Sequence, residues 1–123
     1  MLFRSYAIVD GGIHHLKYFG QIMAMHTPII FQGTKRNDKK QKYCLCGSLC
    51  TVADVLAKDV ELFELQIDDV LEFKKCGAYS LTESSSLFLS RDMPSVYLKK
   101  NGCLKEVRGP VESSEINTNG YKV

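Results

Sequence analysis

The sequence predicts a mainly β domain, a barrel or sandwich with one or two short helices. Short runs of β-branched, aromatic and other apolar residues alternate with segments rich in Gly, Asn, Asp, Ser and Pro, which is the pattern of strands joined by turns. Near the C-terminus an Asn-Gly pair at 101–102 separates two such runs, a strong signal of a tight hairpin. The sequence has no internal repeat and no long amphipathic helix, so an all-β architecture fits it best.

Length and composition indicate one folded globular domain. A chain of 123 residues with 45% hydrophobic and 24% charged residues has enough apolar side chains for a single core. Its 16 basic and 14 acidic residues are interspersed, which argues against binding to nucleic acid or an anionic membrane. With no signal-peptide pattern at residues 1–6 and no apolar run of ~18 residues, we expect a cytoplasmic protein without a membrane span.

The five cysteines are predicted to be free thiols in a reducing compartment. An odd number cannot all pair within one chain, and no Cys-x-x-Cys unit is present. Cys44 and Cys46 have strand spacing and share a face, where free cysteine acts as a small core hydrophobe. Because His-x-x-x-His spacing is also missing, we expect no metal site.

In the first half of the chain the pattern predicts three strands. Residues 6–9 form an apolar run stopped by the turn at 10–12, and the segment 13–21 is irregular. Residues 28–31, opened by a proline, are expected to form a hairpin with 41–46 across the polar, basic loop between them.

The second half contains one ambiguous segment and three further strands. Residues 55–62 fit either extended chain throughout or one helical turn that runs into extended chain. The strand 70–74 alternates apolar and charged residues, so one of its faces is solvated. Residues 79–89 form a short helix or turn, and 95–100 pairs with 103–108. We divide the chain into a domain at 1–112 and a polar tail at 113–123, and we expect residues 113–120 to fray.

Two turn motifs carry a resemblance to a known family. The first, Gly-x-x-Cys-x-x-x-Asp, runs from Gly47 to Asp54, and the second is Gly-Ala-Tyr at 77–79. In this order they resemble the C-terminal β-domain of the fold-type III pyridoxal-phosphate-dependent decarboxylases, which include diaminopimelate and ornithine decarboxylases. The likeness continues at 9–12 and 91–98, so it covers most of the chain. It implies a Greek-key β-barrel or sandwich like the C-terminal domain of alanine racemase, and a place in amino acid metabolism such as lysine biosynthesis.

The resemblance implies roles for residues that would otherwise be structural. Without the resemblance, Cys50 would be interpreted as a side chain that fills the core. By resemblance, it matches the family's catalytic cysteine, which reaches the partner subunit's cofactor across a homodimer interface. Tyr79 matches the tyrosine that hydrogen-bonds the cofactor phosphate. Thr51 stands where the family commonly has an acid that recognises the substrate's far amino group, and a neutral hydroxyl cannot offer that charge.

The segment after the first strand departs from the diaminopimelate pattern. Asp10 either forms an Asx turn or, by resemblance, lies near the dimeric active site. The family's arginine for the substrate carboxylate is expected near 17–18 and is missing. Instead, His14 and His15 resemble a branch of decarboxylases from biosynthetic clusters, some of which act on carrier-tethered amino acyl groups. The two histidines either line the substrate pocket or lie on the surface.

In the family the cofactor's lysine, its glycine-rich phosphate loop and a (β/α)₈ barrel precede the position of Asp10, where this chain has only nine residues. We therefore expect a C-terminal fragment of a decarboxylase. It would work with its own barrel domain and a second subunit, and would neither bind pyridoxal phosphate nor react alone. The alternative is a free-standing β-barrel binding or interaction module. A racemase on this scaffold is a weaker third interpretation.

Overall fold

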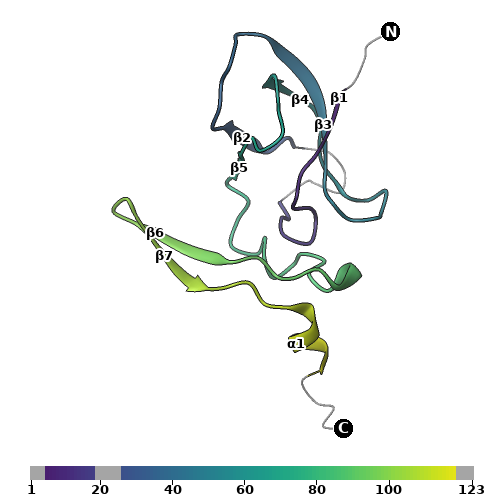
Figure 1. The fold of residues 1–123 in the computed structure, drawn as a ribbon, viewed down its shortest axis with the longest axis vertical. Coiled ribbons are helices and arrows are strands. Elements are labelled where there is room, and N and C mark those ends of the chain that lie inside the picture. The colour runs from purple at the N-terminus through teal and green to yellow at the C-terminus, as the bar shows by residue number, and fades with distance from the viewer. Residues whose placement is uncertain (1–4, 19–25, 119–123) are drawn as a thin grey trace.

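The computed structural model describes residues 5–18 and 26–118 and confirms the mainly β prediction (Figure 1). Within these residues seven strands form three small sheets, and the helical structure is limited to a single 3₁₀ turn and one short helix. The strands are β1 (Ser5–Ile8), β2 (Ile29–Gln32), β3 (Lys40–Cys46), β4 (Val55–Phe63), β5 (Leu71–Lys74), β6 (Val96–Lys100) and β7 (Cys103–Arg108).

The three-stranded sheet has the order β1-β3-β4 and contains most of the core. β1 pairs with β3 in parallel, and β3 pairs with β4 antiparallel, so β3 is the central strand. Tyr43, Cys44 and Leu45 are buried one after another, which shows that both faces of β3 are covered there. The other members of the core cluster come from β4: Leu56, Ala57, Val60 and Leu62.

β4 is a strand from its first residue, Val55, so the interpretation of 55–62 as beginning with a helical turn is wrong. Its pairing with β3 contains a β-bulge, because Tyr43 faces Val60 whereas Leu45 faces Ala57. Asp59 at the bulge has a φ of 54°, in the left-handed region. The extra residue interrupts the alternation of buried and exposed side chains, and this interruption made the segment ambiguous in sequence.

β2 pairs with β5, so the predicted hairpin between 28–31 and 41–46 is wrong. Both edges of β3 are already occupied by β1 and β4, which leaves no edge for β2. In the β2–β5 register Ile30 faces Phe73, and both side chains pack against the core cluster. The sheet that results lies against the core through one face and leaves the other in solvent, as the alternation in 70–74 predicted.

The predicted face-sharing of two cysteines is confirmed. The Sγ atoms of Cys44 and Cys46 lie 4.0 Å apart, with Cys44 buried and Cys46 half-buried. Burial raises the pKa of the Cys46 thiol, and the neighbouring Cys44 adds to the effect. All five cysteines are free.

After β5 the chain runs through turns and a 3₁₀ turn at Phe88–Ser90 before the β6–β7 hairpin. Asn101 and Gly102 have φ of 51° and 79°, which confirms the predicted two-residue turn with positive φ at both positions. Residues Ser113–Thr118 form the helix α1, so the expectation that the tail frays is wrong for this part, and 119–123 lie outside the described residues. The backbone N–H of Ser113 donates to the Asp92 carboxylate at 3.3 Å, which ties the start of α1 to the domain.

Large apolar side chains remain in solvent on β1, on β2 and on the β6–β7 hairpin, which projects away from the two other sheets in Figure 1. They include Tyr6 and Ile8 on β1, Ile29 and Phe31 on β2, and Tyr97, Leu98, Leu104 and Val107 on the hairpin. Exposed apolar patches are typical of faces that contact other protein. Within the described residues, no helix has the length and apolar character needed to cross a bilayer.

Candidate functional site

The turn that carries Cys50 connects β3 to β4 and is organised around Asp54. The Asp54 side chain is only 2% exposed. Its Oδ2 accepts a hydrogen bond from the Leu49 N–H at 2.7 Å, within the turn, and its Oδ1 accepts one from the Ile13 N–H at 2.8 Å. One buried carboxylate therefore joins the turn at 47–54 to the segment that follows β1.

Glycines stand where the Asp54 carboxylate comes closest to the backbone. A Cβ at Gly12 would lie 2.6 Å from the carboxylate, and one at Gly47 would lie closer still. Real Cβ atoms do not approach other atoms so closely. The glycines of the Asp-Gly-Gly and Gly-x-x-Cys motifs are thus explained by the space that this carboxylate needs.

The segment of Asp10 lies directly beside the turn. The Ser48 N–H donates to the Gly11 carbonyl at 2.8 Å, and the Ser48 hydroxyl donates to the Asp10 carbonyl at 3.0 Å. The Asp10 side chain is exposed and accepts no hydrogen bond within the described residues, so the Asx-turn alternative has no support. Asp10 is free to contact another molecule.

Cys50 lies outside the strands, as predicted, and its side chain is exposed. Thr51 is half-buried, and its hydroxyl oxygen accepts a hydrogen bond from the Ala53 N–H at 3.3 Å. The next residue, Val52, is almost fully in solvent. This turn presents the Cys50 thiol to an approaching molecule on a backbone that Asp54 holds in place.

His14 and His15 have different environments. His14 is 2% exposed, so the alternative that it lies on the surface is wrong. Its ring centroid is 3.8 Å from that of His15, and its Nδ1 is buried without a partner among the described residues. Burial lowers the pKa of His14, and the neighbouring His15 lowers it further, against the opposing effect of Asp54. The buried ring is therefore neutral at pH 7, and the half-buried His15 is the more accessible of the two.

A third segment, at 91–92, contacts the same turn. The Arg91 guanidinium donates to the Ser48 carbonyl at 3.1 Å, and Nε2 of His15 lies 3.3 Å from the Asp92 carbonyl. Sequence reasoning gave neither residue a role, although both lie within the downstream part of the family resemblance. The structure thus places the segment of Asp10, His14 and His15 beside the turn that carries Cys50 and Thr51, with Arg91 bonded to the same turn.

Tyr79 lies on a separate turn and its ring is 71% exposed. Gly77, with a φ of 85°, makes the tight turn before it. The Ser80 hydroxyl accepts a hydrogen bond from the Lys17 N–H at 2.9 Å, which holds this turn beside the segment after His15. In the described residues no hydrogen bond links Tyr79 to the turn of Cys50, and none involves its phenol.

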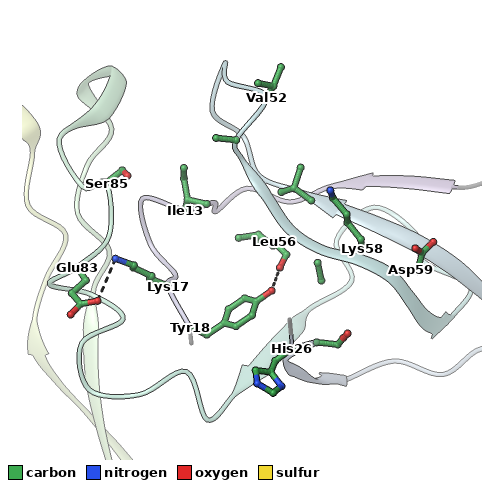
Figure 2. Close-up of a pocket in the computed structure, with 14 residues that line it drawn as sticks. Ile13, Lys17, Tyr18, His26, Val52, Leu56, Lys58, Asp59, Glu83 and Ser85 are labelled. Atoms are coloured by element: carbon green, nitrogen blue, oxygen red, sulfur yellow. Dashed lines mark hydrogen bonds and ion pairs between the residues drawn. The ribbon is translucent and has the colours of Figure 1, made fainter. Parts of the chain in front are cut away.

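A pocket of about 690 Å³ lies next to the Cys50 turn and was not foreseen from the sequence. Its apolar floor includes Ile13 and Leu56, and the Tyr18 hydroxyl donates to the Leu56 carbonyl (Figure 2). On another side, Lys17 and Glu83 form an ion pair at 3.3 Å. Burial raises the pKa of Tyr18, so its phenol stays protonated. The volume is in the range of small-molecule sites.

Within the described residues no cluster of three or more His, Cys, Asp or Glu side chains could hold a metal ion. The exposed thiol of Cys50, the histidine pair and, on a separate turn, the exposed phenol of Tyr79 are the side chains that could take part in chemistry. Comparison with known proteins identifies the kind of domain in which they occur. The sequence profile described as "Pyridoxal-dependent decarboxylase, C-terminal sheet domain" matches residues 3–77. The chain belongs to this decarboxylase family.

Curated relatives of the sheet domain include enzymes with three different substrates. The chain is 32% identical over 109 residues to L-glutamyl-[BtrI acyl-carrier protein] decarboxylase of Niallia circulans, covering 84% of this chain and 26% of the relative. The chain is 32% identical over 103 residues to 2-[(L-alanin-3-ylcarbamoyl)methyl]-2-hydroxybutanedioate decarboxylase of Staphylococcus aureus, covering 76% of this chain and 25% of the relative. It is 29% identical over 106 residues to diaminopimelate decarboxylase of Methanothermobacter thermautotrophicus, covering 86% of this chain and 24% of the relative. The chain thus spans about a quarter of the length of these relatives.

Solved structures confirm the fold of the sheet domain. A protein of Aquifex aeolicus superposes with a TM-score of 0.83 at 25% identity, covering 96% of this chain and 28% of that chain. Diaminopimelate decarboxylase of M. jannaschii, solved with L-lysine, gives a TM-score of 0.79 at 19% identity, covering 96% of this chain and 26% of that chain. Asp10, His14, His15, Cys50 and Thr51 all lie within the region matched by the family profile, and Tyr79 lies two residues beyond it.

Proposed function

We propose that this chain acts as the C-terminal sheet domain of a pyridoxal-phosphate-dependent amino acid decarboxylase. In this proposal a (β/α)₈ barrel domain binds the cofactor, and the sheet domain supplies Cys50 and Tyr79 to an active site shared between two subunits. The observation that carries the proposal is the exposed thiol of Cys50 on a fixed turn, inside the region that matches the family. The exposed apolar residues of β1, β2 and the β6–β7 hairpin support contact with further protein.

The side chains fit the cofactor that the family uses. Tyr79 offers an exposed phenol O–H, a neutral donor suited to a phosphate oxygen. When bound, pyridoxal phosphate supplies the electron sink that allows carbon dioxide to leave an amino acid. Cys50 has one proton on a small, exposed thiol and acts as a proton donor or as a contact to the reacting carbon.

We propose a modified amino acid as the substrate. Thr51 brings no negative charge to the place where a free diamino acid would present its second amino group. Two of the relatives that are 32% identical carry names that specify modified substrates, a glutamyl group on an acyl-carrier protein and an alaninyl carbamoyl derivative. In this proposal Asp10, His15 and Thr51 contact the substrate, and the buried His14 orients His15 through their ring contact.

The test is carbon dioxide release by the complete enzyme that includes this domain, with three substrates compared: free glutamate, free diaminopimelate and glutamate attached to a carrier protein. We expect turnover with the carrier-bound substrate and much slower turnover with free diaminopimelate. Turnover of free diaminopimelate alone would contradict the substrate proposal. A complete enzyme that binds the cofactor but decarboxylates no amino acid or amino acyl group would contradict the function.

A further inference from the structure

We infer that Asp54 is a positioning residue, which fixes the turn of Cys50 against the segment of Asp10. The inference deepens the proposed function, because it rests on a role for Cys50 in the reaction. Asp54 itself is buried and therefore touches neither substrate nor cofactor. Its effect on the reaction is exerted through the backbone that carries the thiol.

Every polar group of Asp54 is used to hold this turn. Its carbonyl accepts from the Gly47 N–H at 2.9 Å, and its own N–H donates to the Thr51 carbonyl at 3.1 Å. The two carboxylate oxygens accept from the Leu49 and Ile13 N–H groups. Three of these four bonds close the turn on itself, before and after Cys50, and the fourth ties it to a segment 41 residues earlier.

The contact is specific for a short side chain with two acceptor oxygens. An amide at this position would direct an NH₂ group at one of the two backbone N–H donors, so one hydrogen bond is lost and two donors face each other. A longer acid has little room, because even a single Cβ added at Gly12 or Gly47 would overlap the carboxylate. A buried N–H without its acceptor is unfavourable, so the segments at 13 and 49 would move to find water.

Arg91 and the Ser48 hydroxyl also hold the turn through hydrogen bonds nearer to solvent. Arg91 donates to the Ser48 carbonyl, and the Ser48 hydroxyl donates to the Asp10 carbonyl. Both residues lie nearer to solvent than Asp54, where hydrogen bonds exchange with water more readily. Among the described groups that connect the three segments, Asp54 is the buried one, and we infer that the position of the turn depends on it most.

The first experiment measures backbone order and amide exchange by NMR in the protein and in Asp54→Asn. Asp68→Asn is the matched control, since Asp68 is exposed and has a φ of 70° that asparagine tolerates. We expect faster exchange of the Ile13 and Leu49 amides and a lower order parameter for Cys50 in Asp54→Asn alone. The Met93 and Val111 amides, which bond each other's carbonyls, should be unchanged. An unchanged order parameter for Cys50 would overturn the inference.

If Asp54→Asn does not fold, Gly12→Ala supplies a similar perturbation from the other side. Its Cβ would displace the carboxylate, and Gly12 has no positive φ that alanine would strain. The same loss of order at Cys50 is expected, and its absence counts against the inference equally.

The second experiment is a double-mutant cycle in the complete enzyme. Asp54→Asn should lower kcat by about tenfold or more while cofactor affinity holds, and it should add little to the loss caused by Cys50→Ala, because both changes act on one contact. Additive losses would indicate a merely structural role and overturn the inference. Cys50→Ala with full kcat would instead contradict the proposed function, and the order parameter of Cys50 then decides the inference by itself.

Discussion

Replacing Cys50 by alanine should lower the turnover of the complete enzyme and leave the stability of this domain almost unchanged. The Cys50 side chain is exposed, lies outside the strands and makes no hydrogen bond within the described residues. Removing an exposed sulfur changes the free energy of unfolding by about 0.5 kcal/mol or less. If the thiol contributes a positioned proton donor, kcat falls by about tenfold to a thousandfold, or roughly 1.4 to 4 kcal/mol of activation free energy.

Cys44→Ala is the matched control because it removes the same atom from a buried position. Cys44 is 5% exposed and lies on the central strand β3. Its loss leaves a small cavity, so we expect about 1 to 2 kcal/mol of destabilisation with kcat nearly intact. Cys50→Ala should therefore lose turnover and keep its stability, whereas Cys44→Ala should lose stability and keep its turnover.

The assay combines carbon dioxide release at saturating substrate with urea unfolding of each variant. Cofactor affinity is measured as well, to separate a loss of catalysis from a loss of binding. A Cys50→Ala enzyme with wild-type kcat and a reduced midpoint of unfolding would show that Cys50 serves packing. That result would refute the assignment of Cys50 to the active site.

Three further substitutions test other parts of the structure. Tyr79→Phe should weaken cofactor affinity about fivefold to tenfold, the effect of losing one hydrogen bond. Because the ring is exposed, Tm should not change. An unchanged cofactor dissociation constant would contradict the phosphate contact. The pKa of His14 lies below its ordinary 6.5 in the folded state, so the unfolded state binds the proton more readily and the free energy of unfolding falls as pH drops below 6.5. His14→Phe should reduce this pH dependence in urea unfolding, and a slope equal to that of the wild type would disprove the explanation. Gly102→Ala should destabilise the domain by about 1 kcal/mol, since Gly102 has a φ of 79°. Gly33→Ala should have a smaller effect, because Gly33 has no positive φ and its Cβ would meet the Val70 carbonyl at an ordinary contact distance of 3.9 Å.

Strand positions and turn types were largely predictable from the sequence, and strand partners were not. The turn at 101–102 was predicted correctly because its conformation is determined by the two residues themselves. The partner of 28–31 was not, because the choice between β3 and β5 depends on whether β1 occupies the edge of β3. That information lies in the packing of distant segments, and local alternation of side chains does not contain it.

The same distinction applies to the candidate site. The position of Cys50 outside the strands followed from its glycine-containing motif, and the structure confirms it. The role of Asp54 was missed, because it arises from a contact with Ile13 across 41 residues of sequence. The burial of His14 was missed as well, since a polar residue in an irregular segment gives no periodic signal. The place of Asp54 as the last residue of the Gly-x-x-Cys-x-x-x-Asp motif was the clue in the sequence to the buried carboxylate.

The parallel pairing of β1 with β3 has a consequence for how the chain acquires its structure. A parallel pair cannot be joined by a tight turn, so β1 stays unpaired until all of β3 exists, whereas β3 with β4 and β6 with β7 are neighbours along the chain. Contacts between distant segments carry a loop-closure entropy that slows their formation. On the ribosome β1 emerges before its partner has been synthesised, and Tyr6 and Ile8 remain available for association with other chains during that interval. We therefore expect the yield of soluble protein to depend on the rate at which the segment after β1 is translated.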